Sequence, residues 1–192
     1  MTNSPTKVIW IYGKSGTGKT RFAKEYCARK NLHYYMCTGS NSPFDGLNNL
    51  SAKEQEVLII DELRPQVMNY QDLLQLLDPM NFDKVAVARY HNPHVMANII
   101  FVCTIYNPFD FYMSMQLKSQ NIDTFAQLHR RIGLTLELTQ TTINEVNFCS
   151  NSQHPIKYEM IQSYPNTLSS KTNKTTFSLK ELNDYKNVEN EK

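Results

Sequence analysis

The stretch "VIWIYGKSGTGKTRFAKEY", Val8–Tyr26, decides the fold class of this chain. It passes from a β-branched and aromatic apolar run, through a glycine-rich turn, into a segment whose apolar residues recur at helical spacing. Half of the chain's six glycines lie in that turn. We therefore predict a buried strand over Val8–Tyr12, a glycine loop, and a helix from Thr20 to about Lys30.

The glycine loop matches the pattern G-x-x-x-x-G-K-[ST] at every fixed position. Its residues are Gly13, Lys14, Ser15, Gly16, Thr17, Gly18, Lys19 and Thr20. Glycines let the backbone curl so that several N–H groups point at one anion, and the following helix adds its positive end. The lysine of this pattern reaches the β- and γ-phosphates, and the hydroxyl is a magnesium ligand. The sequence thus predicts a site for ATP with Mg²⁺.

A second buried strand, Val57–Ile60, is followed directly by Asp61 and Glu62. A carboxylate at the end of such a strand can hold the magnesium through its water shell, which is the role expected of Asp61. Glu62 beside it can orient and deprotonate the attacking water. An adjacent base favours transfer of the phosphoryl group to water, so we expect a hydrolase.

Apolar strands alternate with helical patterns along most of the chain, which predicts an α/β fold with a parallel central sheet flanked by helices. The other expected strands are His33–Met36, Asn98–Thr104 and Leu134–Leu138, and the other expected helices are Tyr70–Asp78 and Phe125–Arg131. Ligands bind at the carboxyl ends of parallel strands, so Gly13, Asp61 and Asn107 should meet at one sheet edge. We expect an ATPase domain over residues 1–148 and a polar, largely flexible tail over residues 149–192.

Composition limits the remaining possibilities. The four cysteines show no paired spacing, which argues against a disulfide framework or a zinc site. No apolar run is long enough to cross a bilayer, and the first residues lack the apolar region of a secretory signal. We therefore expect an intracellular protein that does not bind membranes. The net charge of +2 is too small to indicate nucleic-acid binding by itself, so such a surface would be a local patch, repeated in a ring.

Four elements in order carry a family resemblance: "GKSGTGKT", "VLIIDEL", a basic β-hairpin region, and an apolar strand leading to Asn107. This order resembles the superfamily 3 helicases, found in the C-terminal half of replication initiators of circular single-stranded DNA viruses and rolling-circle plasmids. The resemblance covers about Lys7 to Glu137, with smaller similarities in "SPFDGL", "YQDLLQLLD" and "FAQLHRRI". The chain departs from the family where initiators more often have two aspartates (here Asp61-Glu62), at the hairpin tip "ARYHN", and at "CTIYN".

The resemblance implies a P-loop NTPase of the AAA+-like type with a β-hairpin insertion, which uses ATP to move along single-stranded DNA during rolling-circle-type replication. Asn107 would be the sensor of the γ-phosphate. Arg130 or Arg131 would be the finger inserted into the neighbouring subunit's site, and Arg131 is the preferred candidate. The hairpin would contact nucleic acid through Lys84, Arg89, Tyr90 and His91.

The same resemblance implies partners and a location. We expect a homo-oligomeric ring, a hexamer, and an endonuclease domain or separate nickase as a functional partner. Nicking is not predicted for this chain itself, because it contains no H-x-H pair. The location would be the cytoplasm of a plasmid-carrying bacterium, or the host cell or nucleus if the protein is viral.

Several other interpretations stay open at this stage. "TRFAKEYCARK" after the loop also suits a small-molecule kinase, with Arg130 and Arg131 as its lid. A ring ATPase acting on protein would share the fold, and the RNA-virus branch of the superfamily would act on RNA. Asn107 can equally be an Asn-Pro turn after a strand, and the arginines a solvated pair. A non-catalytic binding module is disfavoured, because every element that hydrolysis requires is present.

Overall fold

The computed structural model describes residues 4–38, 44–86, 92–118, 122–149 and 157–169. The elements are, in order, β1 (Lys7–Tyr12), α1 (Lys19–Lys30), β2 (Tyr34–Thr38), the 3-10 helices η1 (Asp45–Asn49) and η2 (Ala52–Gln55), β3 (Val57–Asp61), α2 (Tyr70–Leu76), β4 (Ile99–Thr104), α3 (Pro108–Ser114), α4 (Phe125–His129), β5 (Leu134–Leu138), β6 (Thr142–Cys149) and β7 (Lys157–Pro165).

One seven-stranded sheet organises the molecule, in the order β2-β3-β4-β1-β5-β6-β7. The first five strands in that order are parallel, and the last two pairings, β5 with β6 and β6 with β7, are antiparallel. β1 lies between β4 and β5 and is the fourth of the seven strands, so the loop that follows it opens at the centre of the sheet. The predicted α/β class with a parallel central sheet flanked by helices is confirmed.

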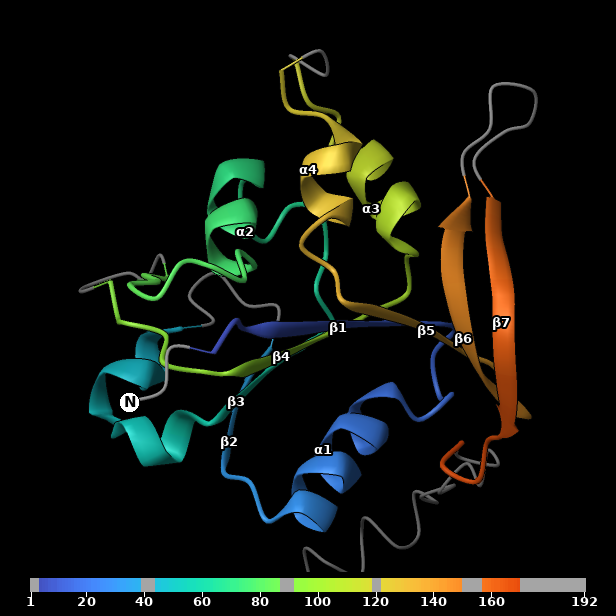
Figure 1. Cartoon of the computed structure of the whole chain (residues 1–192), viewed down its shortest axis with the longest axis horizontal. Helices are drawn as coiled ribbons and strands as arrows, with labels where there is room; N and C mark the ends of the chain where they lie inside the picture. The colour runs from blue at the N-terminus through green and yellow to red at the C-terminus, as the bar shows by residue number, and fades with distance from the viewer. Residues whose placement is uncertain (1–3, 39–43, 87–91, 119–121, 150–156, 170–192) are drawn as a thin grey trace, which may run out of the picture.

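The two faces of the sheet are covered unequally. Figure 1 shows α1 on one face and α2, α3 and α4 together on the other. On the α1 side, Ile11 of β1 packs in a buried cluster with Ala23 and Cys27 of the helix. On the other side, Trp10 lies edge-on to Phe111 of α3, with ring centroids 5.2 Å apart. Alternate residues of β1 thus enter opposite clusters, as a strand buried on both faces requires.

The carboxyl-terminal part departs from the prediction. β6 continues to Cys149, and β7 then pairs with it over its whole length as an antiparallel edge strand. The expectation of a tail from residue 149 onward is therefore wrong for Lys157–Pro165, and the boundary at residue 148 falls inside β6. A strand that meets the sheet through a single neighbour gives no strong apolar pattern, since its other edge and much of its side-chain surface stay exposed.

The base of the predicted hairpin is present. Val85 and His94 form an antiparallel bridge. Backbone hydrogen bonds join Ala86 N to Pro93 O (3.0 Å) and Val95 N to Lys84 O (2.9 Å). The tip, with Arg89, Tyr90 and His91, lies outside the described residues. Within the described part of the chain, no helix has the length and apolar character needed to cross a membrane.

Candidate active site

The phosphate loop connects β1 to α1 at the carboxyl edge of the sheet, where the sequence places it. Gly16 (φ 78°) and Gly18 (φ 86°) adopt the left-handed conformation, which costs glycine little and strains other residues. Gly13 (φ 150°) is also required by packing, because a Cβ there would lie 2.1 Å from the carbonyl oxygen of Leu138. The loop's glycines therefore serve both backbone curvature and close packing against the end of β5.

Lys19 and Thr20 begin α1 and point into the site. The Lys19 ammonium donates to the carbonyl oxygens of Gly13 (2.8 Å) and Lys14 (2.9 Å), so it is held over the loop. The hydroxyl of Thr20, at the start of α1, donates to Oδ1 of Asp61, at the end of β3, at 2.6 Å. Burial lowers the pKa of Lys19, while the nearby carboxylates of Asp61 and Glu62 act in the opposite direction. The predicted phosphate-binding and magnesium-binding groups are thus brought together.

Glu62 stands beside this pair in an uncommon conformation. Its φ is 52°, and its N–H donates to Asp61 Oδ1 at 3.1 Å. A non-glycine residue in the left-handed region costs on the order of 1 kcal/mol and is found preferentially at functional sites. The side chain is exposed and lines the same cavity as Lys19 and Thr20. The geometry therefore places an exposed carboxylate at the cavity expected to take the triphosphate.

A cavity of about 260 Å³ is bounded by these residues and by several that sequence reasoning did not single out. The additional lining residues are Arg21, Arg64, Ile105 and Leu168. Arg64 could have been identified, because it follows the acidic pair at the same strand end and adds a cation to an anion site. Ile105 could have been identified in the same way after β4. Leu168 had no such signal, since its segment was expected to be tail.

The donor set around the loop fits magnesium bound with a nucleotide. Mg²⁺ prefers oxygen ligands, and in nucleotide sites it commonly takes only one or two protein groups together with phosphates and water. The Thr20 hydroxyl and the Asp61 carboxylate form such a pair. Among the described residues, no group of three or more His, Cys, Asp or Glu side chains is arranged to hold a metal ion.

Asn107 reaches the predicted edge but has another contact. It caps α3: its Oδ1 accepts from Asp110 N (2.8 Å), and its Nδ2 donates to Asp110 Oδ2 (2.8 Å). Asn107 does not line the nucleotide cavity, whereas Ile105, the residue directly after β4, does. The structure thus supports the Asn-Pro turn directly, and the sensor role stays a prediction from the resemblance.

Comparison with known proteins identifies the family of this chain. Residues 9–106 match the family described as RNA helicase, a stretch that contains the whole phosphate loop, Asp61 and Glu62. This chain belongs to that helicase family. The chain is also similar to a "Replication protein" of Onion yellows phytoplasma (strain OY-M), 30% identical over 177 residues, which is 92% of this chain. The chain spans 44% of the length of that relative. The resemblance to a superfamily 3 helicase domain of replication initiators is confirmed at the level of the family.

The family match ends before the two arginines predicted as a finger, and the structure distinguishes them. Arg131 donates through Nε to Leu74 O (2.8 Å), through one terminal nitrogen to Gln127 O (2.7 Å), and through the other to Asp78 Oδ2 (3.1 Å). Its side chain is only 10% exposed. Arg130 is exposed and, among the described residues, has no hydrogen-bond or ion-pair partner. The preference for Arg131 does not fit these contacts, because its guanidinium is already used to join α2 to α4.

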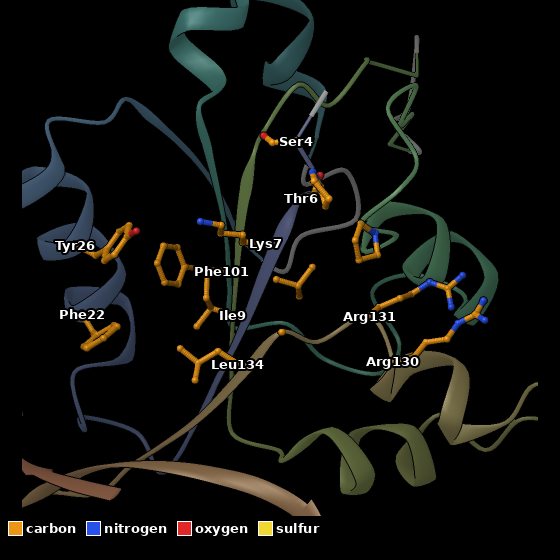
Figure 2. A pocket seen from close by; sticks show the side chains of 14 residues that line it. Ser4, Thr6, Lys7, Ile9, Phe22, Tyr26, Phe101, Arg130, Arg131 and Leu134 are labelled. Atoms are coloured by element: carbon orange, nitrogen blue, oxygen red, sulfur yellow. The ribbon is translucent and has the colours of Figure 1, made fainter. Parts of the chain in front are cut away.

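Both arginines lie far from this chain's own phosphate loop. Gly133 N, shortly after them, donates to Val8 O near the amino end of β1. They border a cavity of about 630 Å³ on that side of the molecule. Figure 2 shows Phe22 and Tyr26 of α1 facing Ile9, Phe101 and Leu134 of the sheet across it, while the guanidinium groups point away. At 3.3 Å per residue, Val8 and Gly13 are roughly 16 Å apart along β1, so Arg130 cannot serve its own chain's site.

Lys84 also differs from its prediction. It is 2% exposed, and its ammonium donates to the Thr6 hydroxyl in the interior. Burial lowers its pKa to about 8. A phosphate-contacting lysine needs an ammonium that reaches solvent, so the assignment of Lys84 to the nucleic-acid contact is wrong for this conformation. Arg89, Tyr90 and His91 lie outside the described residues, and their role stays a prediction.

Proposed function

We propose that the chain is an ATP-dependent helicase domain that moves along single-stranded DNA in rolling-circle-type replication. The observation that carries this proposal is the placement of Lys19, Thr20 and Glu62 around one cavity at the carboxyl edge of a parallel sheet, with Asp61 hydrogen-bonded to Thr20 beside it. Family membership adds the helicase activity, and the similarity to a replication protein adds the replicative setting.

Each residue has a distinct part in hydrolysis. The backbone N–H groups of the loop and the Lys19 ammonium bind and orient the phosphates, which fixes the γ-phosphate for attack. Glu62 accepts a proton from the attacking water and aligns it with that phosphate. Thr20 and Asp61 would hold the Mg²⁺ ion, which supplies positive charge against the β- and γ-oxygens. Because Glu62 is exposed and lines the cavity, it can accept a proton from water, which favours hydrolysis over a kinase reaction.

Arg130 completes the site in trans. It is exposed, unpaired among the described residues, and placed at the end of the sheet opposite to its own loop. An arginine that reaches a neighbour's phosphates stabilises the charge of the transition state and can raise turnover by about 10³-fold or more. We therefore propose a ring of copies, a hexamer by the resemblance, in which each site takes its arginine from the next subunit.

RNA is the second candidate for the substrate. The family that matches this chain is described as RNA helicase, whereas the similar phytoplasma protein is described as a replication protein. The described residues do not include the hairpin tip, which is the segment expected to contact the strand. We propose DNA because the replication-protein match extends over nearly the whole chain, while the family match stops at residue 106.

Phosphate release by the purified chain tests both points. We expect release from ATP and Mg²⁺ without any acceptor, stimulation by single-stranded DNA exceeding that by RNA of the same length, and loss of release in Lys19→Ala. Lys53→Ala, at an exposed position in η2 before the amino end of β3, is the matched control. ADP formation that requires a small-molecule acceptor, with the phosphoryl group recovered on that acceptor and not as free phosphate, would establish a kinase instead. Stimulation by RNA alone would reassign the substrate, and stimulation by neither would favour a ring ATPase acting on protein.

A further inference from the structure

The four residues after β7, Asn166–Ser169, return to the phosphate loop, and we call them the C-terminal strap. In Figure 1 the chain leaving β7 turns back beneath the sheet toward the start of α1. Leu168 lines the nucleotide cavity, and its carbonyl oxygen accepts from an Arg21 guanidinium nitrogen at 3.1 Å. Ser169 is anchored separately, through its hydroxyl to Gln140 O (2.8 Å). A segment distant in sequence is therefore built into the wall of the site.

Asn166 is the centre of this contact. It is 9% exposed, and its Nδ2 donates to two carbonyl oxygens, that of Thr17 in the phosphate loop (2.9 Å) and that of Thr139 after β5 (2.6 Å). Its Oδ1 accepts from Leu168 N at 2.9 Å. An amide has two N–H donors and one carbonyl acceptor, and here both kinds are engaged. One side chain thus joins the loop, the end of β5 and the strap.

The strap also touches the loop directly at Gly18. A Cβ on that residue would lie 2.6 Å from Leu168 O and 2.8 Å from the Leu168 carbonyl carbon. Neither atom belongs to a flexible side chain, so no larger residue fits without moving the strap. Gly18 is thus constrained twice, by its positive φ and by this close approach. The contact is tight enough for the strap to influence the conformation of the loop.

The geometry of the peptide between Thr17 and Gly18 links the Asn166 side chain to the direction of the Gly18 N–H. The peptide unit between Thr17 and Gly18 is planar and trans, so its C=O and N–H point in opposite directions. With the Thr17 carbonyl held by Asn166, the Gly18 N–H is directed away from Asn166, and Gly18 lines the nucleotide cavity. Phosphate loops bind through such N–H groups. Holding the carbonyl outward therefore orients one anion donor before the nucleotide arrives, which reduces the ordering cost of binding.

We propose that Asn166 is a positioning residue of the nucleotide site, acting through the Thr17–Gly18 peptide. This inference rests on the proposed function, because it assumes that the cavity takes a nucleotide. It predicts that losing the Asn166 donors weakens nucleotide affinity more than it lowers the turnover of bound ATP. A residue that only stabilised the β6–β7 region would not affect affinity in the folded protein.

The test is the affinity of the full chain for fluorescently labelled ADP with Mg²⁺, measured well below the melting temperature. We expect the Kd to rise by about tenfold in Asn166→Ala, the effect of about 1.4 kcal/mol. Asn166→Asp should weaken binding further, because its carboxylate faces two carbonyl oxygens. In steady-state assays both should raise KM more than they lower kcat. Ser163→Ala is the control, since it removes a neighbouring hydrogen bond to Asn144 without touching the loop.

The possible outcomes separate this inference from the proposed function. If the unaltered chain binds no labelled nucleotide, the proposed function fails and the inference fails with it. If the unaltered chain binds and both folded Asn166 variants bind with the same Kd, only the inference is overturned. Should Asn166→Asp not fold, Asn166→Ser, which keeps a short donor, replaces it and should give a Kd between those of the unaltered chain and Asn166→Ala.

Discussion

The adjacent residues Arg130 and Arg131 should have different effects when each is replaced by alanine. The loss of Arg131 should lower stability, and the loss of Arg130 should lower turnover. Arg131→Ala removes three hydrogen bonds from a side chain that is 10% exposed, among them the ion pair with Asp78. Hydrogen bonds of charged groups contribute about 1.5 kcal/mol or more each, and part of this loss is recovered when water enters. We expect the free energy of unfolding to fall by about 3 kcal/mol, which lowers the Tm of a chain of this length by about 6–12 °C.

Arg130→Ala should leave stability nearly unchanged, within about 0.5 kcal/mol, because the side chain is exposed and unpaired among the described residues. Its effect should appear in turnover. If Arg130 reaches the neighbouring subunit's phosphates, its loss lowers kcat by about 10³-fold, while the Kd for nucleotide changes little. Thermal melting and phosphate release should both be measured on the two variants. We expect Arg131→Ala to lower the Tm, and Arg130→Ala to lower turnover at nearly unchanged Tm.

Mixing subunits tests the trans placement. We expect Arg130→Ala and Lys19→Ala each to have lost nearly all turnover, but in a mixed ring an Arg130→Ala subunit with an intact loop can face a Lys19→Ala subunit with an intact arginine. We expect partial recovery of ATP turnover on mixing, with mass measurement confirming assembly. No recovery in assembled mixtures would refute the trans mechanism. A stable Arg131→Ala variant that has lost turnover would return the finger to Arg131.

Two further predictions concern Glu62 and Lys84. Glu62→Gln should lower the rate of phosphate release by about 10²-fold or more while labelled ADP binds as before, since it removes a base and leaves the contacts of Lys19 and Thr20 in place; equal loss of binding would contradict the assigned role. Lys84 has a folded-state pKa of about 8 against an ordinary 10.5, so the unfolded chain binds more protons between these values and stability should rise with pH in that window. Urea unfolding at the two ends of this window should show a rise in the free energy of unfolding of about 1 to 3 kcal/mol, and Lys84→Met should abolish the rise. The same pH dependence in both proteins would show that Lys84 does not cause it.

The nucleotide half of the site was predictable because its signals are local. The loop needs a strand before it, glycines within it and a helix after it, and all three are contiguous in Val8–Tyr26. Asp61 needed one further step, the rule that parallel strands end at a common edge. The Thr20–Asp61 hydrogen bond is the outcome of these two inferences.

The errors share a physical cause, which is dependence on partners far away in the chain. Arg131 is held by Leu74 and Asp78, and Lys84 by Thr6, so no pattern around either cation indicates burial. The C-terminal strap is a stronger example. Its polar residues resemble a solvated tail, and only the pairing of β7 with β6 brings Asn166 to the phosphate loop.

If Arg130 is the finger, as proposed, the positions of the loop and of Arg130 mean that one copy of this chain cannot complete its own site. The loop opens at the carboxyl end of β1, and the segment carrying Arg130 is fastened to the amino end of the same strand by the Gly133–Val8 hydrogen bond. A straight strand cannot bring its two ends together, so no internal movement that keeps the sheet intact would place Arg130 at its own phosphates. A second copy, related by rotation, can. The proposed trans arginine therefore predicts that turnover depends on protein concentration, and an ATPase rate per subunit that is constant from dilute monomer to assembled ring would contradict it.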